Sequence, residues 1–177
     1  VVKDELLGCY FMPYVSKILH TGRPLVYVDC FAGKGKFDDG TPGSPLIALE
    51  AIDKCKNITC TKFSQIEATF IDLNYADDLR KNLQKYPWVN VVAGKYEDNL
   101  ANILQGKEHC NVFLYIDPYG IKALKFSIFD DLSKKNFNSI ELLINMNSFG
   151  FIREACHALG TSFNDNTLFD DLIEYDP

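Results

Sequence analysis

The feature that most constrains the fold of this 177-residue chain is its regular alternation of short apolar runs with amphipathic stretches. The apolar runs have the β-branched and aromatic composition of buried strands, and stretches with helical periodicity separate them. Strands separated by helices form βαβ units, in which the strands are parallel and the helices cover both faces of the sheet. The expected strands span residues 25–31, 66–73, 88–94, 111–117 and 139–147.

The helical stretches begin with a leading helix over residues 3–20. Pro13 lies inside it and should kink the helix or divide it in two, because proline has no N–H group to donate. Ser44 is expected to be the N-cap of the next helix, with Pro45 at its first position and residues 46–54 helical. Further helices are expected at residues 75–86, 97–106, 126–135 and 149–159. The apolar stripe of the leading helix comprises Leu6, Leu7, Tyr10, Phe11, Tyr14, Ile18 and Leu19.

These elements predict one α/β domain over residues 1–177, with a Rossmann-like, doubly wound and mainly parallel sheet. The length suits a single domain with a sizeable core, and we find no internal repeat or low-complexity linker. The chain ends at LIEYDP with the pattern of a further helix and turn. We therefore expect the sheet to continue beyond this point, so that the chain is truncated at its C-terminus.

Composition narrows the class of protein. The 18 basic and 24 acidic residues give a net charge of −6, whereas domains that bind nucleic acid mainly through phosphates are usually basic. No apolar stretch approaches the roughly 18 residues of a membrane span, so we expect no membrane association. Six cysteines without a C-x-x-C pair predict reduced thiols and a cytoplasmic setting. Three histidines in unrelated contexts indicate no metal site.

A glycine-containing loop, VYVDCFAGKGKF, follows the first expected strand. Ligands of open parallel sheets bind at the carboxyl ends of the strands, where Asp29, Gly33 and Gly35 should lie. Glycines let a ligand approach the main chain, and loop N–H groups favour negative charge. The Walker pattern is absent, and the dinucleotide fingerprint lacks its third glycine because position 38 is Asp38.

A ligand with both an ammonium and a carboxylate group suits this loop better than a phosphate does. S-adenosylmethionine carries that pair at one end, for Asp29 and the loop N–H groups, and an adenosine at the other. Asp72, at the end of the second strand, is expected to accept from the ribose hydroxyls, and Tyr96 to flank the adenine. Alternatively, the glycines merely shape a turn and Asp72 is a solvated helix cap. The expected cofactor-binding residues are Asp29, Phe31, Ala32, Gly33, Gly35, Asp72 and Tyr96.

A second loop, FLYIDPYG, follows the fourth expected strand and resembles the D-P-P-Y loop of amine methyltransferases. That resemblance implies catalytic roles for Asp117, Pro118 and Tyr119: the carboxylate and a carbonyl accept from a planar NH₂ group, and the aromatic ring stacks on the base. Tyr119 replaces the second proline, so the loop is closer to the D-P-F-G of transfer-RNA guanine-N2 dimethyltransferases, without their following Ser/Thr-Pro. The alternative is a plain turn fixed by proline and glycine.

Together these segments resemble the three-Cys-motif partner proteins. The matching stretches are K-x-x-x-L-x-x-Y in the leading helix, VDCFAGKG, GSPLIAL, FIDLN and YIDPYG, which span residues 3–145. The resemblance implies a Rossmann fold of the class I methyltransferase type and a companion protein bearing a three-cysteine motif. The chain departs from the family at Lys34, where proline is frequent, and at Asp72, where glutamate is common.

Three functions follow as hypotheses. The first is an S-adenosylmethionine-dependent methyltransferase acting on an exocyclic amine of a nucleic-acid base, which must then be single-stranded or flipped out. The second is a non-catalytic methyltransferase-like protein that works with the companion. The third, a nicotinamide oxidoreductase, is disfavoured by the missing third glycine.

Overall fold

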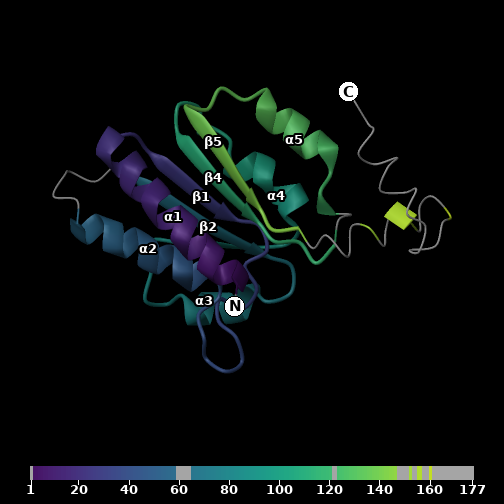
Figure 1. Ribbon diagram of the computed structural model, residues 1–177, viewed down its shortest axis with the longest axis horizontal. Helices are drawn as coiled ribbons and strands as arrows, with labels where there is room; N and C mark the ends of the chain where they lie inside the picture. The colour runs from purple at the N-terminus through teal and green to yellow at the C-terminus, as the bar shows by residue number, and fades with distance from the viewer. Residues whose placement is uncertain are drawn as a thin grey trace.

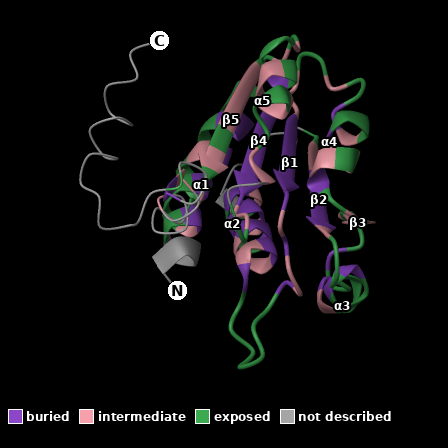
Figure 2. Ribbon diagram, turned by 90° about the vertical axis from the view of Figure 1, so that its right-hand side faces the viewer, coloured by how far each residue is buried: buried purple, intermediate pink, exposed green. Residues whose placement is uncertain are grey.

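A computed structural model of the chain describes residues 2–58, 65–120, 123–146, 152, 155–156 and 160, the side chains of 2–5 and 58 excepted. It contains a five-stranded parallel sheet with the strand order β3-β2-β1-β4-β5 (Figures 1 and 2). Because the chain order reverses between β1 and β4, the expected doubly wound α/β fold is confirmed. The strands are β1 (Leu25–Asp29), β2 (Ile66–Asp72), β3 (Asn90–Ala93), β4 (Asn111–Ile116) and β5 (Ser139–Ile144).

Helices pack on both faces of the sheet (Figures 1 and 2). Every residue of β1 and β4 is buried, which explains why these strands are continuous apolar runs in the sequence. One core cluster lies between the sheet and α1, α2 and α3, and a second lies between the sheet and α4 and α5. The helices are α1 (Val2–Thr21), α2 (Ser44–Ile58), α3 (Ala76–Asn82), α4 (Tyr96–Ile103) and α5 (Phe126–Ser133).

The leading helix corrects two expectations. It runs from Val2 to Thr21 through Pro13, so the division at proline is wrong. Pro13 has no N–H group to donate to the carbonyl of Cys9, four residues earlier. Both residues are exposed, so this carbonyl can bind water instead. Leu6 and Tyr10 are 55% and 43% exposed, because they lie beside the stripe that faces the sheet. That stripe consists of Leu7, Phe11, Val15, Ile18 and Leu19.

Several element boundaries also differ from the expected ones. Helix α3 ends at Asn82 instead of residue 86, because a turn follows in which the Tyr86 N–H donates to the Leu83 carbonyl. Strand β3 is confined to four residues paired with β2. Strand β5 ends at Ile144 instead of residue 147, because residues 145–146 have no strand structure. The helix expected at residues 149–159 lies largely outside the described residues.

Candidate functional site

The loop between β1 and α2 folds back on itself at the carboxyl edge of the sheet (Figure 1). Gly33 and Gly35 have φ angles of 60° and 82°, the left-handed region that glycine adopts without strain. A Cβ atom on Gly35 would lie 2.9 Å from the Leu79 side chain. Beyond it, residues 36–42 form a small hairpin closed by an antiparallel bridge between its first and last residues. Both glycines therefore stand at positions that require them.

Asp29 lies beneath this loop and is fully buried. Its Oδ1 accepts from the Phe31 N–H at 3.1 Å, and its Oδ2 accepts from the Ser44 hydroxyl at 2.6 Å. Helix α2 begins at Ser44. The residue before it, Gly43, accepts the first helical hydrogen bond through its carbonyl, from the Ile47 N–H. Ser44 is not the expected N-cap, because its hydroxyl binds Asp29 instead.

Burial raises the pKa of Asp29 to about 7, against the lowering effect of its hydrogen bonds with Ser44 and Phe31. The negative charges of Asp117 and Asp72 raise the pKa further. The carboxyl groups at the ends of β2 and β4 therefore both act on Asp29 at this edge. Such an arrangement favours a ligand that brings positive charge.

The amino end of α2 is where a phosphate would be expected to bind if the loop held a dinucleotide. A helix N-terminus normally favours an anion, because its first N–H groups are unpaired and its dipole is positive there. At α2 the Asp29 carboxyl group already lies at that end, bonded to Ser44. A phosphate bound there would meet this carboxyl group, which argues against a dinucleotide at the loop.

Asp72, the last residue of β2, holds the loop by its other side. Its Oδ2 accepts from the Gly33 N–H at 2.8 Å, and its Oδ1 accepts from the N–H groups of Asn74 and Tyr75 at 2.8 and 2.7 Å. A carboxylate offers about four acceptor positions, so roughly one is left for a ligand hydroxyl. Asp72 is therefore both a brace for the loop and a half-buried acceptor at the edge.

The other expected cofactor residues divide into two groups. Within the loop, the Phe31 N–H donates to Asp29 and the Ala32 N–H donates to the Ile71 carbonyl. These two N–H groups are therefore already paired, and a ligand carboxylate would have to bind N–H groups later in the loop. Tyr96 is 1% exposed, packs its ring 5.2 Å from that of Phe31, and donates its hydroxyl to the Ala123 carbonyl. Its ring thus supports the wall of the site and offers a ligand almost no surface.

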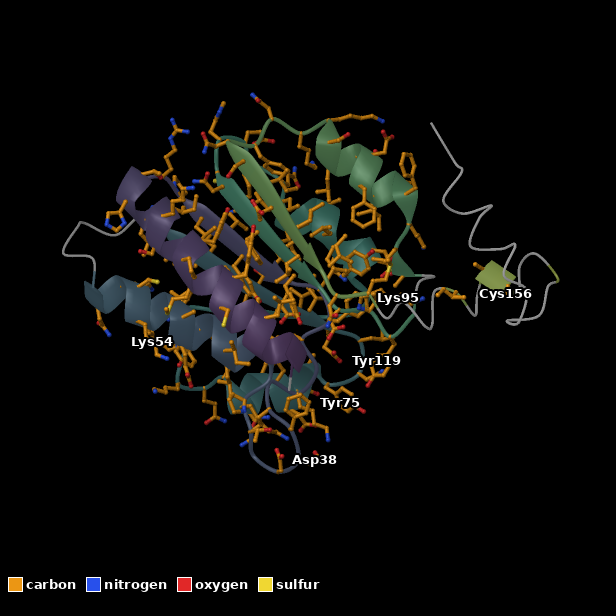
Figure 3. All side chains as sticks on the ribbon, in the orientation of Figure 1. Asp38, Lys54, Tyr75, Lys95, Tyr119 and Cys156 are labelled. Atoms are coloured by element: carbon orange, nitrogen blue, oxygen red, sulfur yellow. The ribbon has the colours of Figure 1, made fainter. Side chains whose placement is uncertain are left out.

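The second loop lies beside the first. Asp117 directly follows β4 and is half-buried, whereas the Tyr119 side chain is fully exposed at 105%. Figure 3 shows Tyr119 and Tyr75 at the same end of the molecule. Pro118, which separates Asp117 from Tyr119 in the sequence, is half-buried. Asp117 thus lies close enough to Asp29 to raise its pKa, and the ring of Tyr119 is open to solvent.

Strand periodicity explains why the three acids converge. Side chains two residues apart in a strand share a face. Tyr27, Phe70 and Tyr115 all belong to the core under α1, α2 and α3, and each precedes one of the acids by two residues. Asp29, Asp72 and Asp117 therefore lie on the same face of the sheet at its carboxyl edge.

Sequence reasoning missed one residue that shapes the loop. Asn82, at the end of α3, donates its side-chain amide to the Lys34 carbonyl at 2.8 Å. The two residues are 48 positions apart, and no local pattern signals the contact. The loop is therefore held from α2, α3 and β2 together.

No protein-family model matches the chain, and no curated protein matches it. Within the part of the chain that the structure describes, no group of three or more His, Cys, Asp or Glu side chains is placed to hold a metal ion, and no helix is long and apolar enough to cross a membrane. The fold alone does not indicate a function, because this type of fold supports many functions.

Proposed function

We propose that the chain is an S-adenosylmethionine-dependent methyltransferase that acts on an exocyclic amine of a nucleic-acid base. The observation that carries the proposal is the convergence of three carboxyl groups around a glycine loop at the carboxyl edge of a parallel sheet. S-adenosylmethionine brings a sulfonium and an ammonium group, whose positive charge suits this edge. A nicotinamide dinucleotide would place its pyrophosphate against the same carboxyl groups.

Each group has a role in this proposal. Asp72 accepts from the ribose hydroxyls with its remaining acceptor position, while its bond to Gly33 keeps the loop in place. Asp29 acts from below the loop, through its charge and its bonds to Ser44 and Phe31, because its side chain has no exposed surface. When bound, S-adenosylmethionine would supply the methyl group and leave as S-adenosylhomocysteine. Asp117 would hold the acceptor amine, whose displaced proton would pass to solvent, and catalysis would be largely positioning.

The acceptor follows from the loop after β4. Asp117 is an oxygen acceptor for an N–H group, and the exposed ring of Tyr119 is available to stack on a base. Lys34, the basic residue between the two loop glycines, already pairs with Asp38 at 2.9 Å. We therefore include in the proposal a companion protein, of the kind that bears a three-cysteine motif, which adds phosphate contacts to the base contacts of this chain in a cytoplasmic setting.

Calorimetric titration with S-adenosylhomocysteine tests the cofactor site. We expect micromolar binding by the wild-type chain and a roughly 10- to 100-fold loss in the Asp72→Ala variant, the effect of removing a charged hydrogen bond. Asp72→Asn keeps only one acceptor oxygen, so it loses either the bond from Gly33 or those from Asn74 and Tyr75, and we expect a loss of affinity in this variant as well. Asp78→Ala is the matched control, since Asp78 is an exposed acid on α3 that contacts Lys81.

Transfer of a labelled methyl group to nucleic acid then tests the reaction. Wild-type activity that is lost in Asp117→Ala, with S-adenosylhomocysteine affinity retained, would support the proposed role of the second loop. Binding without transfer to any nucleic-acid pool would favour the non-catalytic partner. Absence of S-adenosylhomocysteine binding by the folded chain, or tighter binding of NAD, would refute the cofactor assignment.

A further inference from the structure

Asn145, which directly follows β5, carries an unused hydrogen-bond donor. Its side-chain nitrogen Nδ2 is buried, and within the described part of the chain it has no hydrogen-bond partner. Buried side-chain nitrogens are normally paired, because leaving one unpaired destabilises the folded protein. An orphaned donor of this kind at the carboxyl edge of a sheet is a group that a ligand can satisfy.

The position of Asn145 places it next to Asp117. The pairing of β4 with β5 puts Ile116 beside Ile144, and it continues one residue further because the Asn145 N–H donates to the Ile116 carbonyl at 2.8 Å. Asp117 and Asn145 are therefore neighbours across the two strands. Leu143, two residues before Asn145, packs against the core under α1, α2 and α3, which is the face that Asp117 shares.

We propose that Asn145 is a specificity-determining residue that reads the ring nitrogen beside the acceptor amine, while Asp117 accepts from the amine itself. This inference rests on the proposed function and names its substrate class. An acceptor and a donor on adjacent strands match a base edge that presents an N–H donor next to a ring-nitrogen acceptor. The amide of asparagine supplies the donor of this pair, and the carboxylate of aspartate supplies the acceptor.

The nucleic-acid bases differ in this respect. Adenine has a ring-nitrogen acceptor on either side of its amine, and cytosine has one beside its amine. Guanine has an N–H donor on one side of its amine, and the acceptor on the other side lies next to the sugar. Thymine and uracil have no exocyclic amine. The pair formed by Asp117 and Asn145 therefore selects adenine or cytosine and rejects guanine.

Binding of single-stranded oligonucleotides to the chain in the presence of S-adenosylhomocysteine tests the inference. Each strand is a run of thymine or uracil with one central adenine, cytosine or guanine, and fluorescence anisotropy gives its affinity. We expect a preference for adenine or cytosine over guanine of about 10- to 100-fold, the discrimination of a two-point base contact. Asn145→Leu should abolish this preference, and so should Asn145→Asp, which replaces the donor by an acceptor.

A matched control is Asn90→Leu, the same substitution at an exposed residue that opens β3 at the opposite edge of the sheet. It should keep the preference, and all three variants should keep their affinity for S-adenosylhomocysteine. A preference for guanine, no preference, no binding of any strand, or a preference that survives Asn145→Leu would overturn the inference. If S-adenosylhomocysteine binds normally in those cases, the proposed cofactor site stands; if it does not bind, both proposals fall.

Discussion

Replacing Asp29 by asparagine should remove a pH dependence of stability that the wild-type chain shows. Asp29 is fully buried and its pKa is raised to about 7, chiefly by burial, from 3.8. Asparagine has nearly the same shape and can still contact Ser44 and the Phe31 N–H, but it never ionises. The comparison of the two proteins therefore isolates the ionisation of one carboxyl group.

The sign follows from proton binding. Between pH 3.8 and about 7 the folded chain keeps a proton on Asp29 that the unfolded chain has released. The free energy of unfolding therefore falls as pH rises through this window, and the loss is complete above pH 7. Each pKa unit corresponds to about 1.4 kcal/mol, so the whole window amounts to about 4 kcal/mol, of which about 3 kcal/mol falls between pH 5 and pH 8.

Urea unfolding at pH 5, 6, 7 and 8 measures the effect in both proteins. The difference in free energy of unfolding, wild type minus Asp29→Asn, should fall by about 3 kcal/mol over this range. The pKa of Asp39, lowered by hydrogen bonds from Thr41, acts in the opposite direction but is common to both proteins and cancels. A difference that is flat with pH, or that rises, would show that Asp29 does not carry a raised pKa in the folded chain.

Two further substitutions test the packing around the site. Gly35→Ala should destabilise the chain by about 1–3 kcal/mol in urea unfolding, because it combines a positive φ with a close contact to Leu79. Gly106→Ala is the control, because Gly106 has a φ of 72° and open space around it, so its substitution should show the backbone strain alone. Equal losses in the two variants would contradict the contribution of the Leu79 contact. Phe113→Ala should cost about 3–5 kcal/mol, because this buried ring lies within 6.2 Å of four other aromatic rings. The exposed Phe126 is its control, and a similar loss of thermal stability in Phe126→Ala would refute this account of the core.

Much of the fold could be predicted because its signals are local. The continuous apolar runs that become β1 and β4 are typical of strands buried on both faces, and the helical stretches between strands indicate parallel pairing. The unusual backbone angles of Gly33 and Gly35 could be predicted for the same reason, since a glycine pair directly after a strand indicates a turn with positive φ. Proline misled the prediction for α1, because the tolerance of a helix for Pro13 depends on its exposure to water and not on its neighbours in sequence.

The sequence by itself determined the order of the elements and the edge at which the acids lie, because periodicity and strand order follow from short-range patterns. Only the tertiary structure decided what each acid does there. Asp72 bonds to Gly33 across 39 residues, and Asp29 is buried beneath a loop held by Ser44. Such contacts depend on which strands and helices become neighbours, and so does the burial of the unpaired Asn145 amide. Burial and long-range hydrogen bonding set the charge and geometry of the site, and neither is a property of a local stretch of sequence.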